Sequence, residues 1–374
     1  MKKAKRFLAV LLMLMLLAPL VSSCSEAYLT YKDSVIPDYA YRYWFASNKR
    51  YFIEKYSDIE DTAECWNKKI ASEDGSEITT GEYLEKYTLE NAMSIVCELQ
   101  MFKEYDLKLD DAAVEKVDTY ISELVKYRYE DSKSAFNKAL KEAYGINMDQ
   151  LREILLMEKK AQAVESYLFG DSGIMKPTDA EKEQYYTENY KRLQVLLIKT
   201  YSEYVLDEDG NVVKDDLGMY KIKYYTEEEI AEKMLRAAKV EEALETGTDF
   251  EKLIELYGEL KIEGYPNGFY VTGNDYEAVV GSGYDPDVFA DVLKQETGTV
   301  KRYDLEKDAV IFVKSLPLLD KAYESESDAG QFDSFEDYVI TEKYRKILAE
   351  MWKDISVDDR VYTLKTVDVQ KGIF

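Results

Sequence analysis

The chain has 374 residues, of which 46% are hydrophobic and 33% charged, so it is long enough for two or three folded segments with cores of their own. Its formal net charge is −25 and it contains no histidine. The charge disfavours nucleic acid and anionic lipid headgroups as partners. The lack of histidine excludes a histidine-based triad and histidine-ligated zinc. Because Cys-x-x-Cys and Gly-Lys-Ser/Thr motifs are also missing, the sequence predicts no cofactor and no metal.

The first 24 residues form a targeting pattern. Four basic residues between Lys2 and Arg6 precede an apolar run over 7–20, which is too short for an ordinary spanning helix. Val21-Ser22-Ser23-Cys24 then resembles the lipobox of a bacterial lipoprotein signal peptide. The resemblance implies that residues 1–23 are removed and that lipid is attached to Cys24, where several acyl chains give stable anchoring. Removal of four basic residues would leave a net charge of −25 − 4 = −29. The alternative is an ordinary signal peptide with a chance cysteine.

Residues 24–35 are polar and predict a tether, and a helical region follows. Apolar residues recur at helical spacing over 37–56, 80–105, 111–129, 134–144 and 149–169. The first of these helices is aromatic nearly all round, so it is either clasped by other helices or binds a partner. The 33 tyrosines of the chain allow the same two interpretations, as packing residues or as an adaptable surface for peptides.

A mixed region begins after Pro177. Thr178 and Glu181 form a capping box for a helix to residue 190, and LQVLLIK over 193–199 predicts a strand. Residues 201–225 predict a hairpin. A second capping box, Thr226 with Glu229, starts a helix that continues to 244.

The stretch 250–314 has the order helix, Gly-rich loop, helix and hairpin. Phe250, Leu253, Ile254 and Tyr257 have helical spacing, a second short helix carries Phe289, and strands are predicted over 300–303 and 309–313. Residues 317–333 are acidic and rich in serine, which indicates a mobile linker. A last helix is predicted from Ser334 to 354, and 361–369 is predicted to be a short strand or tail.

Two cysteines remain after Cys24. A disulfide between Cys65 and Cys97 is chemically allowed outside the cytoplasm. Cys97 lies on the apolar side of a predicted helix, so a buried thiol is the alternative.

Several phrases resemble secreted foldases of the PrsA/SurA type. TDFEKL, VFADVLKQETGTV and DAVIFVKS are similar to a parvulin-type prolyl isomerase domain, and PTDAEKEQYYTENY is similar to the segment that joins chaperone and isomerase domains. The resemblance implies an α+β, mostly helical fold. It places a helical chaperone domain like that of SurA and trigger factor at 36–176 and an inserted parvulin-like (FKBP-like) domain at 177–316. After the linker, a C-terminal helix and tail at 334–374 would return to the helical domain.

The resemblance also implies where an isomerase site would lie. The two histidines of the family fall at Val195 and Val310, its Cys/Asp position at Leu260, and its proline-pocket methionine at Asp285. Phe289 alone is kept from the family pattern, and its alternative role is that of a core residue. The polar cluster is therefore replaced by apolar residues, and an acid stands in the apolar floor.

The resemblance predicts a foldase or chaperone on the extracytoplasmic face of a bacterial membrane, with unfolded or nascent secreted polypeptides as partners and no nucleic acid. Isomerase activity is predicted to be weak or absent. An active histidine-free isomerase is one alternative. A solute-binding lipoprotein is another, although the chain lacks the repeated strand–helix alternation of two α/β lobes.

Overall fold

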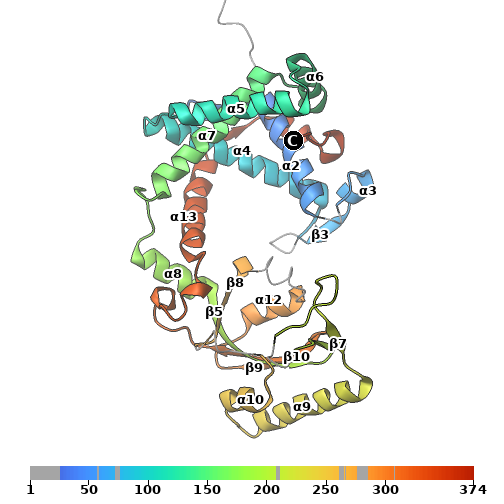
Figure 1. Ribbon diagram of the computed structural model, residues 1–374. Coiled ribbons are helices and arrows are strands. Elements are labelled where there is room, and N and C mark those ends of the chain that lie inside the picture. Colours follow the sequence, from blue (N-terminus) through green and yellow to red (C-terminus); the bar gives the residue numbers. More distant parts are fainter. Residues whose placement is uncertain are drawn as a thin grey trace, which may run out of the picture. The chain divides into compact units, whose positions relative to one another are not determined.

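The computed structural model describes residues 26–56, 59–71, 76–207, 211–260, 265, 267–275, 285–306 and 308–374. The predicted signal peptide and the lipidation site Cys24 lie outside these residues. The chain divides into two compact units, drawn in Figure 1: unit 1 comprises Met1–Lys176 with Tyr344–Phe374, and unit 2 is Pro177–Lys343. None of the described helices is both long enough and apolar enough to cross a membrane.

Unit 1 is mainly helical, with small antiparallel sheets. Its helices are α2 (Asp38–Lys55), α3 (Ala63–Trp66), α4 (Thr80–Glu104), α5 (Asp111–Arg128), α6 (Lys133–Tyr144), α7 (Met148–Phe169) and α14 (Asp359–Thr363). Its strands are β1 (Ala27–Tyr31), β2 (Ser34–Pro37), β3 (Lys69–Ala71), β4 (Glu77–Thr79) and β11 (Ser356–Val357). The order β11-β1-β2 forms one sheet, with Leu29 opposite Val357.

The aromatic helix α2 is clasped by its neighbours. Tyr41, Trp44, Phe45 and Phe52 are all buried, and α2 packs against α4, α6 and α7. The indole Nε1 of Trp44 donates to Glu158 at 2.8 Å, which satisfies its one donor. These four rings therefore act as packing residues, whereas Tyr51 of the same helix is exposed.

The C-terminal segment of the chain is held in unit 1 by a buried lysine. The Lys49 ammonium is hydrogen bonded to the carbonyl oxygens of Thr366 (2.9 Å) and Val369 (2.6 Å) and paired with Asp61 at 2.7 Å. A buried cation is stable only when its donors are satisfied in this way. Residues 361–369, expected as a strand or tail, instead hold the end of α14 and the 3₁₀ turn η5 (Thr366–Asp368).

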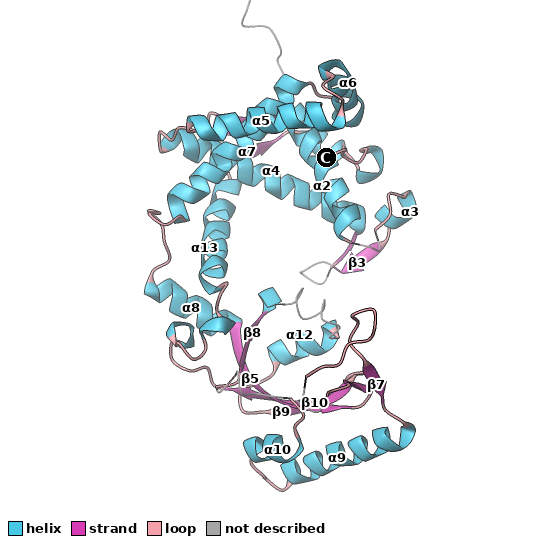
Figure 2. Ribbon diagram, viewed as in Figure 1, coloured by secondary structure: helices cyan, strands magenta, loops and turns pink. Residues whose placement is uncertain are grey.

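Unit 2 is built on a four-stranded antiparallel sheet of order β8-β5-β10-β9. Its strands are β5 (Tyr190–Lys199), β8 (Phe269–Thr272), β9 (Val300–Asp304) and β10 (Ala309–Leu316), and β6 (Ser202–Tyr204) with β7 (Ile222–Tyr224) forms a separate ribbon. Its helices are α8 (Asp179–Asn189), α9 (Glu227–Glu245), α10 (Phe250–Tyr257) and α12 (Pro286–Lys294). Figure 2 shows α9 and α10 on one side of this sheet and α12 on the other.

The sheet is buried on both faces because strand side chains alternate. On one face Leu196 and Ile198 of β5 pack with Val240 of α9 and Phe250 of α10. On the opposite face Leu193 of β5 packs with residues of α12, β9 and β10. A third cluster joins Tyr186 of α8 to residues that follow β10.

Two predicted connecting segments are folded in the structure. Residues 27–37, mostly assigned to a tether, form β1 and β2 because Leu29 and Ile36 are fully buried. Residues 317–333, expected to be a mobile linker, hold the 3₁₀ turns η3 (Ala322–Glu324) and η4 (Ala329–Gln331). Ala322 and Phe332 are buried here, so this segment is packed into unit 2 although its composition is acidic. Helix α13 (Phe335–Trp352) follows, starting in unit 2 and ending in unit 1.

The predicted fold class is confirmed: the chain is α+β and mostly helical, with a mainly helical unit 1 and a unit 2 built on an antiparallel sheet. Cys65 and Cys97 are not joined by a disulfide. Burial raises the pKa of the Cys97 thiol to about 12.

Candidate functional site

An apolar pocket in unit 2 is the candidate site. It has a volume of about 300 Å³ and lies on the sheet face covered by α12. Its lining is Leu193, Val195, Leu197, Leu260, Phe269, Val271, Asp285, Val288, Phe289, Val292, Ile311 and Val313. A lining of this kind favours apolar ligands, because only one of these residues is charged.

The strand register explains why these residues meet. Residues 193, 195 and 197 alternate to one face of β5, and Ile311 of β10 lies directly opposite Leu197. β8 extends the same surface, since Phe269 pairs with Leu193. The pocket wall is thus formed by three adjacent strands, and α12 supplies the other side.

Four of the five residues predicted from the family pattern line this pocket. Val195 comes from β5, Leu260 follows α10, Asp285 precedes α12, and Phe289 lies within α12. Phe289 is only 6% exposed, so it can serve both as pocket wall and as packing residue of the helix.

The fifth position, Val310, lies on the wrong face of the sheet for this pocket. It is buried against α9 and α10, whereas its neighbour Ile311 lines the pocket. Neighbouring residues of a strand point to opposite faces of the sheet, so a difference of one position decides which face a side chain occupies. The β10 residue that does line the pocket, Ile311, is also apolar.

Asp285 is the one ionisable residue of the lining, and its main local role is a helix cap. Its Oδ1 accepts the backbone N–H groups of Asp287 at 2.8 Å and Val288 at 3.4 Å. A carboxylate in this position stabilises the first turn of α12. The acid in the predicted apolar floor thus helps to hold the helix that carries Phe289.

The loop that carries Leu260 is fixed by the adjacent Glu259. The Glu259 carboxylate accepts Lys233 at 2.9 Å, Arg236 at 2.6 Å and the backbone N–H of Lys199 at 3.0 Å. Partial burial lowers the pKa of Lys233, but its hydrogen bonds to Glu259 and Tyr225 outweigh this and raise it above the ordinary value. This charged cluster attaches the end of α10 to β5 and α9, and so positions one wall of the pocket.

Sequence reasoning missed several lining residues. The alternation of LQVLLIK would have placed Leu193 and Leu197 beside Val195. Phe269 and Val271 were assigned to a Gly-rich loop, although their residue types suit a strand.

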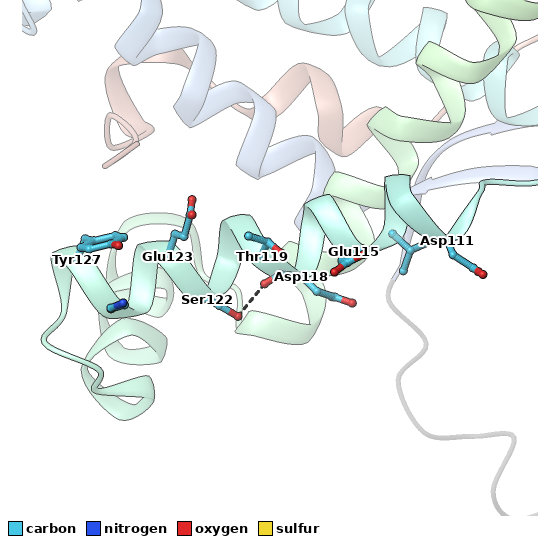
Figure 3. A pocket seen from close by; sticks show the side chains of 9 residues that line it. Asp111, Glu115, Asp118, Thr119, Ser122, Glu123 and Tyr127 are labelled. Atoms are coloured by element: carbon cyan, nitrogen blue, oxygen red, sulfur yellow. Dashed lines mark hydrogen bonds between the residues drawn. The ribbon is translucent and has the colours of Figure 1, made fainter.

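A second hollow, of about 610 Å³, lies on α5 in unit 1. All its lining residues belong to that one helix, and Figure 3 shows their side chains spread along it. Ser122 donates to the backbone oxygen of Asp118, whose carboxylate pairs with Arg152. In the described part of the chain no three His, Cys, Asp or Glu residues are arranged to hold a metal ion. This surface therefore offers no convergent groups for chemistry.

Comparison with known proteins gives structural matches alone: no family model and no curated protein matches the chain. It is similar to PrsA from Bacillus subtilis, with 15% identity, a TM-score of 0.22, and coverage of 80% of this chain and 93% of that one. It is also similar to a peptidylprolyl isomerase (PrsA) from Bacillus cereus, with 18% identity, a TM-score of 0.25, and coverage of 79% and 96%. It is similar, too, to the foldase protein PrsA of Streptococcus pneumoniae, with 14% identity, a TM-score of 0.21, and coverage of 79% of this chain and 97% of that one. At these identities and TM-scores no activity is transferred, and the finding is that the chain is similar to PrsA-type foldases, as the sequence phrases predicted.

Proposed function

We propose that this chain is a protein-folding factor that binds unfolded or nascent secreted polypeptides outside the cytoplasm. A lipid on Cys24 would tie it to the extracytoplasmic face of a bacterial membrane. Unit 2 would hold proline-containing segments in its apolar pocket, with weak or no isomerase activity. The lipobox sequence supports the location, and the pocket supports the binding role. The similar solved structures are described as PrsA, as a foldase and as a peptidylprolyl isomerase.

The observation that carries the proposal is a pocket that keeps an apolar wall and lacks a polar cluster. Rotation about an Xaa-Pro bond crosses a barrier of about 18–20 kcal/mol, which an isomerase lowers by binding the twisted amide more tightly than the planar one. Phe289 and its apolar neighbours can enclose a proline ring and exclude water. Val195, Leu260 and Ile311 carry no side-chain donor or acceptor for the amide. That composition supports the proposal of binding without efficient catalysis.

The first test measures cis–trans exchange of a short Xaa-Pro peptide by NMR, using a soluble chain that begins at residue 25. We expect concentration-dependent shifts of the peptide resonances without marked acceleration of exchange, and loss of the shifts in Phe289→Ala. Leu256→Ala is the matched control, since Leu256 is an exposed apolar residue of α10, which lies on the other side of the sheet from α12. Circular dichroism would verify that both variants are folded.

Two results of this experiment would change the assignment. Strong acceleration that disappears in Phe289→Ala would establish the alternative, an active isomerase without histidine. Absence of any shift at high protein concentration would remove the pocket from the proposal. The chaperone role is tested separately, by whether a near-stoichiometric amount of the chain slows aggregation of an unfolded protein.

A further inference from the structure

Residues 201–225, here called the arm, lie in sequence between β5 and α9, and their described parts, 201–207 and 211–225, form a small ribbon (Figure 1, at the label β7). β6 pairs with β7, and Val205 donates its backbone N–H to the Lys221 carbonyl at 3.0 Å. Val213 joins the same network, donating to Val205 at 2.8 Å and accepting from Lys221 at 2.9 Å. Tyr225 donates to the Tyr201 carbonyl at 2.9 Å and closes the base. The arm thus has a backbone network of its own.

The two faces of the ribbon differ in chemistry. Tyr204 lies opposite Ile222, and Tyr224 is two residues further along the same strand, so these side chains share one face. The neighbouring pair, Glu203 opposite Lys223, forms a salt bridge at 3.5 Å on the other face. The arm is therefore amphipathic, with an apolar face and a charged face.

The apolar face is open to solvent. Tyr204, Ile222 and Tyr224 are 51%, 47% and 60% exposed in the described chain, although apolar strand faces are normally packed. Tyr204 and Tyr220 also meet with ring centroids 5.7 Å apart, which extends the surface along the ribbon. An exposed apolar face on an ordered ribbon indicates an interaction surface.

Charge decides which occupant fits this face. The arm contains six acids and three lysines, giving 3 − 6 = −3, within a chain of net charge −25. A second copy of the chain would bring the same charge to the contact and be repelled. A positively charged partner is attracted, and tyrosine rings bind cations over their faces. Lys214 Nζ already lies 4.8 Å from the centre of the Tyr220 ring, which shows that a cation can approach that ring.

We infer that the apolar face of the arm binds unfolded polypeptide segments that combine apolar or aromatic residues with lysine or arginine. This inference rests on the proposed binding of unfolded polypeptides. It specifies which class of segment is bound, and it adds a second binding site to the Phe289 pocket. The apolar side chains of such a segment cover Ile222 and the tyrosines, and its cations lie over the exposed rings. Binding therefore weakens as salt is added, because the charge term is screened.

The test uses three synthetic unfolded peptides with the same aromatic and leucine positions and with four lysines, four serines or four glutamates between them. Binding to the soluble chain is measured by fluorescence anisotropy. We expect the lysine peptide to bind most tightly and the glutamate peptide most weakly. The triple variant Tyr204→Ser, Ile222→Ser, Tyr224→Ser should bind the lysine peptide about tenfold more weakly. The control on the charged face is Glu203→Ser with Lys223→Ser, which should bind as the parent chain does.

The outcomes separate this inference from the proposed function. If the triple variant binds the lysine peptide as tightly as the parent chain, while the parent chain still slows aggregation, the arm inference is wrong and the proposed function stands. If the parent chain binds none of the peptides and does not slow aggregation, the proposed function fails as well. Sedimentation that shows a dimer of the parent chain and a monomer of the triple variant would also overturn the inference, in favour of a second copy as occupant.

Discussion

Two glutamates of helix α4 illustrate how single residues set the pH response of unit 1. Glu98 is buried, and burial raises its pKa although the Tyr344 hydroxyl donates to it at 2.8 Å. Glu82 is exposed at the start of the helix, where hydrogen bonds from Thr79 lower its pKa. The two carboxylates therefore act on stability in opposite directions as pH changes.

We predict that Glu98→Gln raises the free energy of unfolding of unit 1 by about 1 kcal/mol at pH 7, since the cost of burying the charge is removed while the Tyr344 contact can be kept. A raised folded-state pKa means that this cost applies above that pKa and disappears as pH falls, so the gain should vanish below about pH 4. Urea unfolding at pH 7 and below about pH 4 measures this gain in the free energy of unfolding. Glu82→Gln is the control of opposite sign: its lowered pKa contributes stability at pH 7 that is lost in acid. A gain for Glu98→Gln that is equal at both pH values would contradict the assignment.

At the scale of elements, the long helices and the main strands of unit 2 could be predicted because their patterns are local. The repeats of 3.6 residues and the two capping boxes define α4, α7, α8 and α9 without reference to the rest of the chain. β8 could not be found in this way, since four residues after a Gly-rich stretch become a strand only by pairing with β5. Four of the positions implied by the resemblance line the pocket, whereas Val310 lies on the other face of the sheet, because the register of β10 depends on its partner strand.

β5 gives a direct test of the two-faced sheet. Leu196 is fully buried against α9 and α10, whereas its neighbour Leu197 lines the pocket. Leu196→Ala should lower the free energy of unfolding by about 3 kcal/mol and leave peptide affinity per folded molecule unchanged. Leu197→Ala should cost about 1 kcal/mol and weaken binding of the Xaa-Pro peptide. Thermal unfolding and NMR titration of both variants measure this, and equal effects of the two on binding would argue against the pocket.

At the scale of the whole molecule, the segment after β10 belongs to unit 2 instead of linking domains. Tyr186 and Tyr190 of the first part of the unit pack against Phe332 and Phe335, which lie beyond residue 316. Asn267 also donates to the Asp328 carboxylate at 2.9 Å. A fragment of unit 2 that ends at 316 would therefore leave an aromatic cluster without its second half.

We predict that a fragment of residues 177–343 unfolds cooperatively, whereas 177–316 melts at a lower temperature or binds a hydrophobic dye in its native buffer. Differential scanning calorimetry of the two fragments measures the difference. Phe332→Ala in the longer fragment should lower its free energy of unfolding by about 3 kcal/mol, which is part of the stability that the shorter fragment lacks. Equal melting temperatures for the two fragments would mean that 317–343 adds nothing to the core.

The division of unit 1 between 1–176 and 344–374 has a consequence for biosynthesis. A ribosome delivers the chain from its N-terminus, so all of unit 2 emerges before unit 1 has its last segments. During that interval β1 lacks its partner β11, and the Lys49 ammonium lacks the carbonyls of Thr366 and Val369. Unit 1 is thus the first unit to be synthesised and the last to be completed. Helix α2 gains its contacts with the C-terminal segment only after residues more than 300 positions further along the chain have been made.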